Sequence, residues 1–485
     1  MPRWRSRWSW CLRICWTSAK ACWIPDVSLS EQLQVEREQR VTGRLEHISA
    51  ALQPTLFREE GSLIRMIGIK LEAVGCQAPI GSRCKIITDE GASMEAEVVG
   101  FSDGSLFLMP EGNLRGVRLG ARVVPLDSGG VVEVGDGLLG RVIDGAGKPI
   151  DGGPAISCLH HIPLRGTPIN PLDRTPINEP LDVGVRAINA LLSMGKGQRM
   201  GLFAGSGVGK STLLGMMTRH TEADVIVVSL VGERGREVRE FVDEILGEEA
   251  LAKAIVVATP ADDSPLMRVH GAWRATAIAE YFSTRGKSVL LLMDSLTRVA
   301  QAQREIGLAV GEPPVSKGYP PSVFSLLPAI VERAGNSASG SVTAVYTVLV
   351  EGGDFDDPVS DASRAILDGH IVLSREVADS GLFPAIDIEP SVSRLMTAIA
   401  DGPQQEMARE VKRLYALYQQ NQDLINIGAY QQGADASVDR AIIAAPHIRS
   451  FIAQDAAEKI DMSGSLQALR GLFEICSAPV ADNES

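Results

Sequence analysis

The spacing of hydrophobic positions differs between the first, middle and last parts of the chain. From Leu63 to Leu126, short apolar runs alternate with glycine-containing turns. Short strands at such close spacing are typical of a small closed β-domain. The stretch contains no cluster of residues with catalytic chemistry. Its predicted strand segments are 63–73, 84–91, 96–104, 106–110 and 121–126.

The middle of the chain contains near-continuous runs of aliphatic and β-branched residues, such as DVIVVSLV at 224–231. Such runs predict strands that are buried on both faces of a mostly parallel sheet, with helices between them. Ligands bind at the carboxyl edge of a sheet of this kind. The Gly- and Pro-rich stretches 130–154 and 167–184 are typical of an extended connector. The other predicted strands are 199–203, 254–259, 288–294, 343–350 and 370–373.

Helical spacing dominates at the two ends of the chain. Four apolar residues in the segment 30–52 are spaced as on one face of a helix: Val41, Leu45, Ile48 and Leu52. Ser28 with Glu31 is a candidate capping box for this helix. After about Met396 no strand pattern remains, and 409–425 and the end of the chain predict a helical domain.

These patterns predict an α/β protein with a small β-barrel before the parallel sheet and a helical domain after it. A length of 485 residues is too great for one compact core and suits two or three domains. The expected boundaries are 1–29 for an atypical tail, 30–60 for the N-terminal helix, 61–127 for the β-barrel, 128–395 for the α/β core and 396–485 for the C-terminal helices.

Composition and charge exclude several classes of protein. Hydrophobic residues make up 45% and charged residues 22% of the chain, as in an ordinary soluble globular protein. The net charge of −13 disfavours a protein that coats nucleic acid, and we expect no nucleic acid partner. No apolar run approaches the roughly 18 residues of a membrane-spanning helix, so any membrane association would be peripheral.

The first 23 residues differ in composition from the rest. They hold five basic residues, no acidic residue, five of the six tryptophans and three of the seven cysteines. The remainder has 42 basic and 60 acidic residues, a net charge of −18. Arg13 interrupts the apolar stretch, which disfavours a secretory signal, while an interfacial membrane anchor stays open. We favour a disordered tail, or one absent from the native product, with translation starting near Val27 or Leu29 at a non-AUG codon.

The other cysteines are scattered, without a CxxC pair or a histidine at metal-ligand spacing, which favours a reduced cytosolic protein. They are Cys76, Cys84, Cys158 and Cys476. The adjacent His160 and His161 would point to opposite sides of an extended segment. We interpret both as loop residues and not as ligands.

The segment AGSGVGKS at 204–211 matches a phosphate-binding loop between a buried strand and a helix. Its glycines let backbone N–H groups turn toward phosphate oxygens, and the helix that begins at Ser211 adds the positive end of its dipole. Lys210 can reach the β- and γ-phosphates, and the Ser211 hydroxyl can coordinate Mg²⁺. Ala204 stands where the strict pattern has glycine. The predicted ATP-binding residues here are Gly205, Ser206, Gly207, Val208, Gly209, Lys210, Ser211 and Thr212.

Two carboxylates follow other predicted strands. Asp294 ends the run SVLLLMD and is a candidate for the Mg²⁺ shell, through water. Glu233 follows the run VVSLV, on the same sheet edge as Lys210 and Asp294, and can polarise a water for in-line attack on the γ-phosphate. Arg234 is a candidate for contacting phosphate or orienting Glu233. For Asp294 the plainer alternative is an aspartate that merely ends a strand. For Glu233 it is the solvated, charged start of a helix. If Glu233 has this role, the site hydrolyses ATP and does not merely bind it.

Taken together, these motifs resemble the catalytic subunits of the rotary ATPase superfamily, from about residue 35 to 450. DSLTRVAQAQREIGLAVGEPPVSKGYPPSVFSLLPAIVERAG (294–335) is more similar to the type III export ATPases than to an ATP synthase β subunit. FAGSGVGKSTLLGMM (203–217), YQQNQDLINIGAY (418–430) and DGHIVLSRE (368–376) favour the flagellum-specific branch.

The resemblance implies a RecA-like core in a homohexamer that hydrolyses ATP with Mg²⁺ at subunit interfaces. PAIDIEPSVSR (384–394) matches the segment where the family has its arginine finger. Arg394 would then enter the neighbouring subunit's site and stabilise the transferred phosphoryl group, whereas the residues alone indicate a surface arginine. Phe383 stands where relatives place an aromatic ring against adenine, and otherwise reads as a core phenylalanine.

The resemblance also implies partners: a stator-like regulator dimer at the N-terminal region, a coiled-coil central stalk protein, export chaperones with their cargo, and the membrane export gate. The implied location is cytoplasmic, peripheral to the inner membrane at the flagellar base. Three departures limit the resemblance, and the first is Ala204 in place of a motif glycine. Gly353 replaces a common aspartate, so the loop 351–358 has no assigned role, and the first 25 residues match nothing expected in the family.

The favoured function is ATP hydrolysis that drives flagellar type III protein export, with release and unfolding of chaperone-bound substrates. An injectisome ATPase is the nearest alternative, and a proton-translocating ATP synthase catalytic subunit shares every phosphate-binding residue. A ring-shaped nucleic-acid translocase is disfavoured because the β-domain lacks interleaved basic and aromatic residues. A non-catalytic nucleotide-binding subunit is disfavoured because it would have no need of Glu233.

Overall fold

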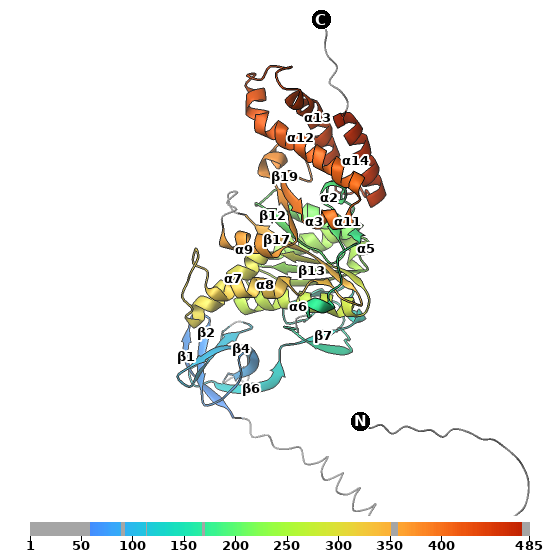
Figure 1. Cartoon of the computed structure of the whole chain (residues 1–485). Coiled ribbons are helices and arrows are strands. Elements are labelled where there is room, and N and C mark those ends of the chain that lie inside the picture. Colours follow the sequence, from blue (N-terminus) through green and yellow to red (C-terminus); the bar gives the residue numbers. More distant parts are fainter. Residues whose placement is uncertain (1–58, 89–92, 113, 167–169, 351–356, 478–485) are drawn as a thin grey trace, which may run out of the picture. The chain divides into compact units, whose positions relative to one another are not determined.

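Six strands close into a barrel in the first part of the computed structural model, in the spatial order β1-β2-β5-β4-β3-β6 (Figure 1). Every pairing is antiparallel, and β6 returns to β1. Along β3, Cys84 and Ile86 are buried while Lys85 is exposed, as the period of two in a strand requires. The predicted small closed β-domain is confirmed. Its strands are β1 (Gly61–Ile67), β2 (Lys70–Val74), β3 (Ser82–Ile87), β4 (Ser93–Ser102), β5 (Ser105–Pro110) and β6 (Arg122–Gly129).

The structure describes residues 59–88, 93–112, 114–166, 170–350 and 357–477. The tail predicted at 1–29 lies outside these residues, together with the Ser28–Glu31 capping box and the helix predicted within 30–52. Gly353 also lies outside them.

A nine-stranded sheet follows the barrel, in the order β19-β18-β12-β17-β15-β13-β14-β8, with β16 paired to β17. Neighbours pair in parallel except β18 with β19 and β16 with β17, so the predicted mostly parallel sheet is confirmed. The strands are β8 (Val142–Ile143), β12 (Arg199–Ala204), β13 (Val225–Val231), β14 (Ala254–Thr259), β15 (Ser288–Asp294), β16 (Gly335–Asn336), β17 (Ser341–Leu349), β18 (Gly369–Leu373) and β19 (Ile386–Ser393).

Burial on both faces of the sheet explains the uninterrupted apolar runs. Every residue of β13 is buried. Ile226 and Val228 belong to one hydrophobic cluster, which also contains side chains of α2, α3 and the C-terminal helices. Val225 and Val227 belong to a second cluster, formed with α6, α7 and α8. Helices therefore cover both faces, as near-continuous hydrophobic strands predict.

The described helices alternate with these strands and then end the chain (Figure 1). They are α2 (Arg186–Leu191), α3 (Lys210–His220), α4 (Gly235–Glu240), the π-helical turn η3 (Phe241–Leu246), α5 (Gly247–Leu251), α6 (Pro265–Thr284), α7 (Leu296–Val310), α8 (Pro321–Val331), α9 (Pro358–Ile366), α10 (Arg375–Asp379), α11 (Met396–Ile399), α12 (Gly402–Asn426), α13 (Ala436–Ile452) and α14 (Met462–Ser477). Two short 3₁₀ turns complete the set, η1 (Asp136–Leu138) and η2 (Pro171–Asp173).

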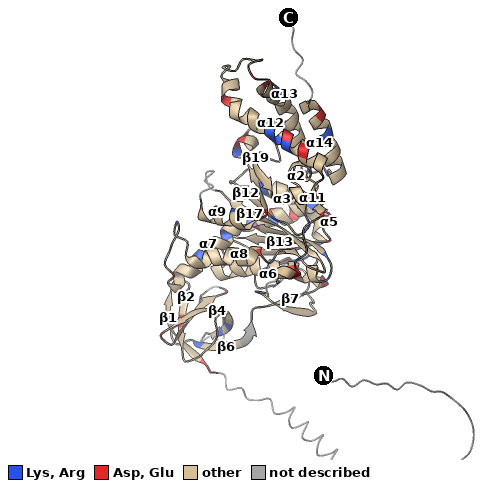
Figure 2. Cartoon of the chain, in the orientation of Figure 1, with Lys and Arg blue, Asp and Glu red and all other residues tan. Residues whose placement is uncertain are grey.

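The predicted C-terminal helical region is confirmed by α12, α13 and α14. Their buried residues Val411, Ile448 and Leu469 join the hydrophobic cluster on one face of the sheet. Figure 2 shows charged segments of both signs on the outside of these helices, whereas the central strands are mostly uncharged. None of the described helices has the length and hydropathy that crossing a membrane requires.

The predicted extended connector contains more regular structure than its Gly and Pro content indicates. β7 (Val131–Val134) pairs with β9 (His160–Pro163), β8 joins the edge of the large sheet beside β14, and β10 (Pro180–Leu181) pairs with β11 (Met194–Gly195). His160 and His161 begin β9, so their interpretation as loop residues is wrong. Pairing with β7 gives these two residues their strand conformation. No local sequence pattern predicts that pairing.

A glycine substitution tests the packing between the start of the α/β core and α3. Gly184 has a φ of +70°, and a Cβ at this position would overlap the Cβ of His220. We expect Gly184→Ala to lower the free energy of unfolding by about 2–4 kcal/mol, from left-handed backbone strain and overpacking. Gly402→Ala is the matched control, because nothing lies within 4 Å of a Cβ there. Urea unfolding followed by circular dichroism measures both, and equal midpoints would contradict the packing described here.

Candidate active site

The phosphate-binding loop joins the carboxyl end of β12 to the first residue of α3. Gly207 and Gly209 have φ values of 78° and 87°, which favour glycine because an L side chain strains this backbone conformation. No side chain caps α3, and its first turn carries no acidic residue. The N–H groups of that turn are therefore left for an anionic ligand. Ser211 and Thr212 follow Lys210 in the same turn.

Lys210 brings the two predicted carboxylates together. Its Nζ lies 2.6 Å from Asp294 Oδ1 and 3.3 Å from Glu233 Oε1. Asp294 ends β15 and Glu233 follows β13, so the three groups come from the carboxyl ends of three strands in one sheet. The hydroxyl of Thr347, on β17, donates to Asp294 Oδ1 at 2.6 Å. The structure thus places all three side chains at one site on one sheet edge.

The electrostatics of the site depend on this shared cation. Burial raises the pKa of Glu233 to about 7, while Lys210 opposes the rise and Asp294 adds to it. Burial alone would lower the pKa of Lys210, but the Asp294 and Glu233 carboxylates outweigh it and raise that pKa. A carboxyl group that titrates near neutral pH is suited to accept a proton in catalysis.

Arg234 lies farther from the centre than its neighbour Glu233. The side chain is exposed, and its Nη1 donates to Glu237 Oε1 at 3.1 Å. A hydrogen bond to Glu237 contributes to the raised pKa of Glu233. Arg234 therefore contacts the partner of Glu233 and not Glu233 itself, and its role toward phosphate stays a prediction.

The segment around α10 lies against the phosphate-binding loop. A Cβ built at Gly209 would lie 3.4 Å from the Phe383 ring, and 47% of Phe383 is exposed. The alternative of a core phenylalanine is thus wrong, and the ring offers a free apolar surface beside the loop. Arg375, the first residue of α10, donates from Nη2 to the carbonyl of Ser206 at 3.1 Å.

Arg394 lies at the opposite edge of its own sheet. Ser393 pairs with Gly369 at the start of β18, whereas Leu373 at the end of β18 pairs with Ala204 next to the phosphate-binding loop. About 13 Å of strand separates these two ends. Arg394 is exposed, and its Nη2 donates to the carbonyl of Arg364 at 3.1 Å. It is therefore not brought together with Lys210 within one chain.

Three residues at the site carry little or no signal in the sequence. Thr347 is a polar residue inside a buried strand, which is the one clue that could have found it. Arg298 packs its stem against the backbone of Gly232, next to Glu233. Arg375 reaches the loop from the start of α10, through its hydrogen bond to the Ser206 carbonyl. For the two arginines no local pattern distinguishes them from surface charges.

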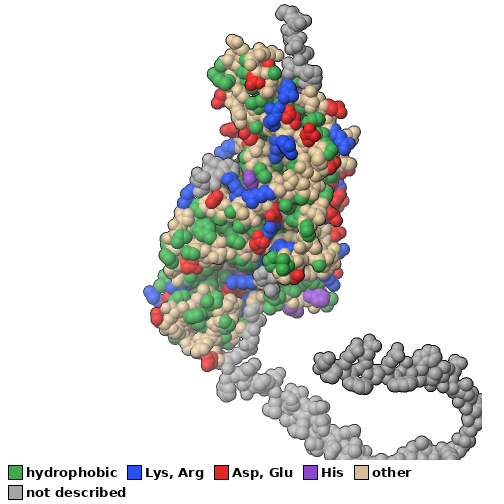
Figure 3. All heavy atoms as spheres, in the orientation of Figure 1, with side chains coloured by type: hydrophobic (Ala, Val, Ile, Leu, Met, Phe, Trp, Pro, Cys, Tyr) green, Lys and Arg blue, Asp and Glu red, His purple; other side chains and the backbone are tan. Residues whose placement is uncertain are grey.

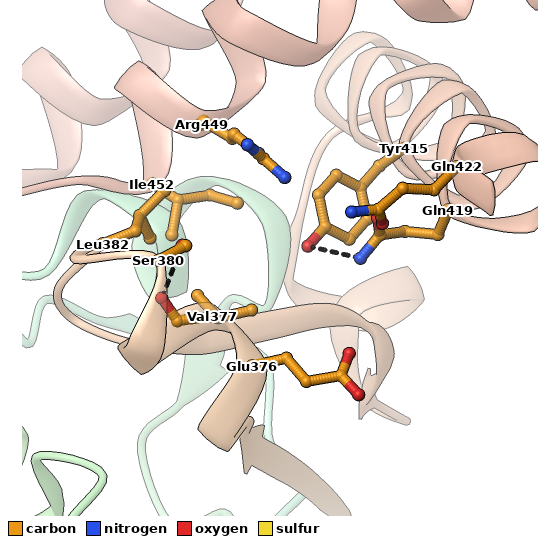
Figure 4. Close-up of a pocket in the computed structure, with 9 residues that line it drawn as sticks. All are labelled: Glu376, Val377, Ser380, Leu382, Tyr415, Gln419, Gln422, Arg449 and Ile452. Atoms are coloured by element: carbon orange, nitrogen blue, oxygen red, sulfur yellow. Dashed lines mark hydrogen bonds between the residues drawn. The ribbon is translucent and has the colours of Figure 1, made fainter. Parts of the chain in front are cut away.

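A separate hollow lies between α10, α12 and α13 (Figure 4). Arg449 and Gln422 point into it, and Tyr415 accepts a hydrogen bond from Gln419 at 3.3 Å (Figure 4). None of the predicted site residues lines it. Its other lining residues are Glu376, Val377, Ser380, Leu382 and Ile452.

Comparison with known proteins gives two matching family models. The model described as ATP synthase alpha/beta family, nucleotide-binding domain, matches residues 184–393, and the T3SS EscN ATPase C-terminal domain matches residues 400–471. The flagellum-specific ATP synthase of Pseudomonas aeruginosa is 55% identical over 440 residues, which cover 90% of this chain and 97% of the relative.

Two solved structures from enteropathogenic E. coli are similar over most of the chain. The assembled ATPase EscN of the type III secretion system matches with a TM-score of 0.81 and 43% identity, over 85% of this chain and 100% of that one. EscN in complex with its central stalk EscO matches with a TM-score of 0.78 and 43% identity, over 85% and 100% of the two chains.

The raised pKa of Glu233 predicts a pH-dependent stability difference. The ordinary value is 4.5 and the folded value about 7, so stability is lost as pH rises through this window. We expect Glu233→Gln to raise the thermal midpoint by about 3–6 °C at pH 8, where the parent carboxylate is charged, and by little at pH 5. Differential scanning calorimetry measures it. The exposed Glu240→Gln is the control, and a Glu233→Gln midpoint at or below the parent's at pH 8 would contradict the account.

Proposed function

The chain belongs to the ATP synthase alpha/beta family, within the group of flagellum-specific ATP synthases and type III secretion ATPases, and from this membership we propose that it hydrolyses ATP to drive flagellar protein export. The observation that carries the proposal is the meeting of Lys210, Asp294 and Glu233 at the carboxyl edge of the sheet. A binding module without turnover has no use for a near-neutral carboxyl group beside its phosphate loop.

In the proposed reaction each residue has one task. The loop N–H groups and the Lys210 ammonium bind the β- and γ-phosphates, which places the terminal phosphorus in front of Glu233. The Glu233 carboxylate accepts the proton of the attacking water at its Oε atoms. Arg234 steadies Glu233 through Glu237. The Phe383 ring stacks on the adenine base beside Gly209.

The residues present also fit a Mg²⁺ ion. Ser211 and Asp294 offer a hydroxyl and a carboxylate oxygen, the ligand types that Mg²⁺ prefers, and one or two protein ligands with substrate phosphates suffice for this ion. In the described part of the chain no group of three or more His, Cys, Asp or Glu side chains is placed to hold a metal. Ser211 and Asp294 would hold the ion, the latter through water, and the ion would supply positive charge that offsets the phosphates.

Arg394 completes the site from a neighbouring copy in this proposal. Its place at the amino edge of its own sheet leaves it unable to reach its own phosphate loop, and a ring of six chains would present it to the next one. EscN is described as an assembled ATPase, and in complex with its central stalk EscO. We extend both features to this chain: a homohexamer with a coiled-coil stalk protein.

The remaining partners and the location follow from the same membership. We propose a stator-like regulator dimer, export chaperones with cargo and the membrane export gate as partners, at a cytoplasmic position peripheral to the inner membrane at the flagellar base. Hydrolysis would release and unfold chaperone-bound substrates. The 55% identity to the flagellum-specific relative, against 43% to EscN, favours the flagellum. The family model for the EscN C-terminal domain keeps an injectisome ATPase as the second candidate.

Two substitutions test the catalytic assignment directly. We expect Glu233→Gln to retain ATP binding and to lower turnover by about 10²–10⁴-fold, because proton acceptance is lost. Lys210→Ala weakens ATP binding itself by about 10–100-fold, because a charge-assisted contact to phosphate disappears. Phosphate release and titration with a fluorescent ATP analogue measure the two quantities. Glu240→Gln is the control, and unchanged turnover in Glu233→Gln would refute the proposal.

Mixed rings test the contribution of Arg394 from a neighbouring chain. Arg394→Ala and Glu233→Gln chains each lack one half of the site, so each is expected to be nearly inactive alone. Rings that contain both variants regain an interface with an intact glutamate and an intact arginine. We expect about a quarter of interfaces to be intact in a random equal mixture, and turnover to recover accordingly. A mixture no more active than its components would exclude an interface site.

A further inference from the structure

Lys412, in the middle of α12, places its ammonium against the backbone of β19. Its Nζ donates to the carbonyl of Ser391 at 2.8 Å. Among the described residues no carboxylate forms an ion pair with it, and burial lowers the pKa of Lys412 to about 8. A cation withdrawn from water without a counter-ion costs folding free energy. A lysine held at such a cost calls for a reason other than stability.

Ser391 is the residue that closes an irregularity in β19. β18 and β19 pair at Val372 with Asp387 and again at His370 with Val392, so β19 carries extra residues between the two pairs. The Ser391 hydroxyl accepts from the Val372 N–H at 2.9 Å and donates to the Asp387 carbonyl. Lys412 donates to the carbonyl of the same residue.

Arg394 directly follows β19, after the paired residues Val392 and Ser393 that come behind this bulge. Ser393 donates from its hydroxyl to the Ser193 carbonyl at 2.8 Å, and the Arg394 N–H donates to the Asp368 carbonyl at 3.0 Å. The position of the Arg394 backbone is therefore set by these two bonds, together with the bulge that precedes them. Lys412 is the side chain from α12 that ties the bulge to the helical region.

Lys412 also belongs to a group of cations around His370. Burial lowers the pKa of His370, and Arg364, Arg394 and Lys412 lower it further. These cations raise the positive potential around His370, which favours the approach of an anion. Figure 3 shows Lys and Arg side chains gathered beside a His on the visible face, at the level of β12 and β19. Asp387 and Glu389 on β19 and Tyr415 on α12 are further titratable groups near Lys412. The helices packed against α12 also carry Asp439, Arg440, His447 and Arg449 on α13 and Arg470 and Glu474 on α14.

We propose that Lys412 is a positioning residue for Arg394: its ammonium fixes the bulge that precedes Arg394, and its charge strengthens the cationic cluster that meets the phosphates bound to a neighbouring chain. The inference rests on the proposed function, in which Arg394 acts in the site of the next chain. Lys412 itself does not touch the nucleotide.

A split between activity and stability tests the inference first. In assembled full-length protein, Lys412→Met is expected to lower kcat about tenfold without lowering the thermal midpoint, because it removes an uncompensated charge and keeps the volume of the side chain. Arg409→Met, an exposed cation on the same helix, is the matched control and keeps both values. A midpoint that falls together with kcat would make Lys412 a structural residue and overturn the proposal.

A double-variant cycle then asks whether Lys412 acts through Arg394. Adding Lys412→Met to Arg394→Ala is expected to cost no further turnover, because the group being positioned is already absent. A second tenfold loss would show an independent role and overturn the inference. Full activity of Arg394→Ala alone would instead refute the proposed function, so the two failures are distinguishable.

The pH profile separates the charge of Lys412 from its hydrogen bond. Parent kcat is expected to fall as pH rises through about 8, since the ammonium loses its proton while the neutral amine still donates to Ser391. Lys412→Met is expected to lack this fall between pH 7 and 9. If kcat falls equally with pH in parent and variant, another group causes the fall. The charge of Lys412 then has no part in positioning Arg394, and that part of the proposal is overturned.

Discussion

The Lys210 ammonium, shared between two carboxylates at the rim of a parallel sheet, is the contact on which the rest of the structure depends. Asp294, Glu233 and Lys210 come from separate strand–helix units, and repulsion between the two acids would drive them apart without the cation. The sheet supplies the rigidity, because its strands are buried on both faces by two hydrophobic clusters. The loop of glycines at the start of α3 then brings the cation to the place where an anionic ligand meets exposed N–H groups.

The two edges of this sheet have different tasks. The carboxyl edge gathers the phosphate loop, both carboxylates and the Phe383 ring. The amino edge carries Arg394, one strand length away, near Arg364, Lys412 and His370. This arrangement suits a proposed assembly in which copies meet edge to edge. Each chain would then place its Arg394 guanidinium at the phosphate-binding loop of its neighbour. In the proposed hexamer, catalysis depends on assembly, and Lys412 contributes to it by positioning Arg394.

Local sequence patterns predict the sheet and half of the site. The buried strands can be predicted because both of their faces are apolar. The loop at 204–211 can be predicted because its positive-φ backbone conformation favours glycine. Strand ends then place Glu233 and Asp294 correctly. Pairings between distant segments of the chain produce no local sequence pattern from which they could be predicted. β9 forms only by pairing with β7, so the local sequence at His160 and His161 indicates a loop. The antiparallel pairing of β19 with β18 places Arg394 away from its own phosphate-binding loop. Thr347 and Lys412 act through single contacts that no spacing reveals.

One structure would test the central claim most directly: the assembled protein with a non-hydrolysable ATP analogue and Mg²⁺, solved at a resolution that shows side chains. The account predicts a Glu233 carboxylate within one water molecule of the γ-phosphorus, Lys210 turned from Asp294 to the phosphates, and Arg394 of an adjacent copy at the same phosphate. A Glu233 carboxylate directed away from the nucleotide, with its place beside the γ-phosphate taken by another group, would contradict it.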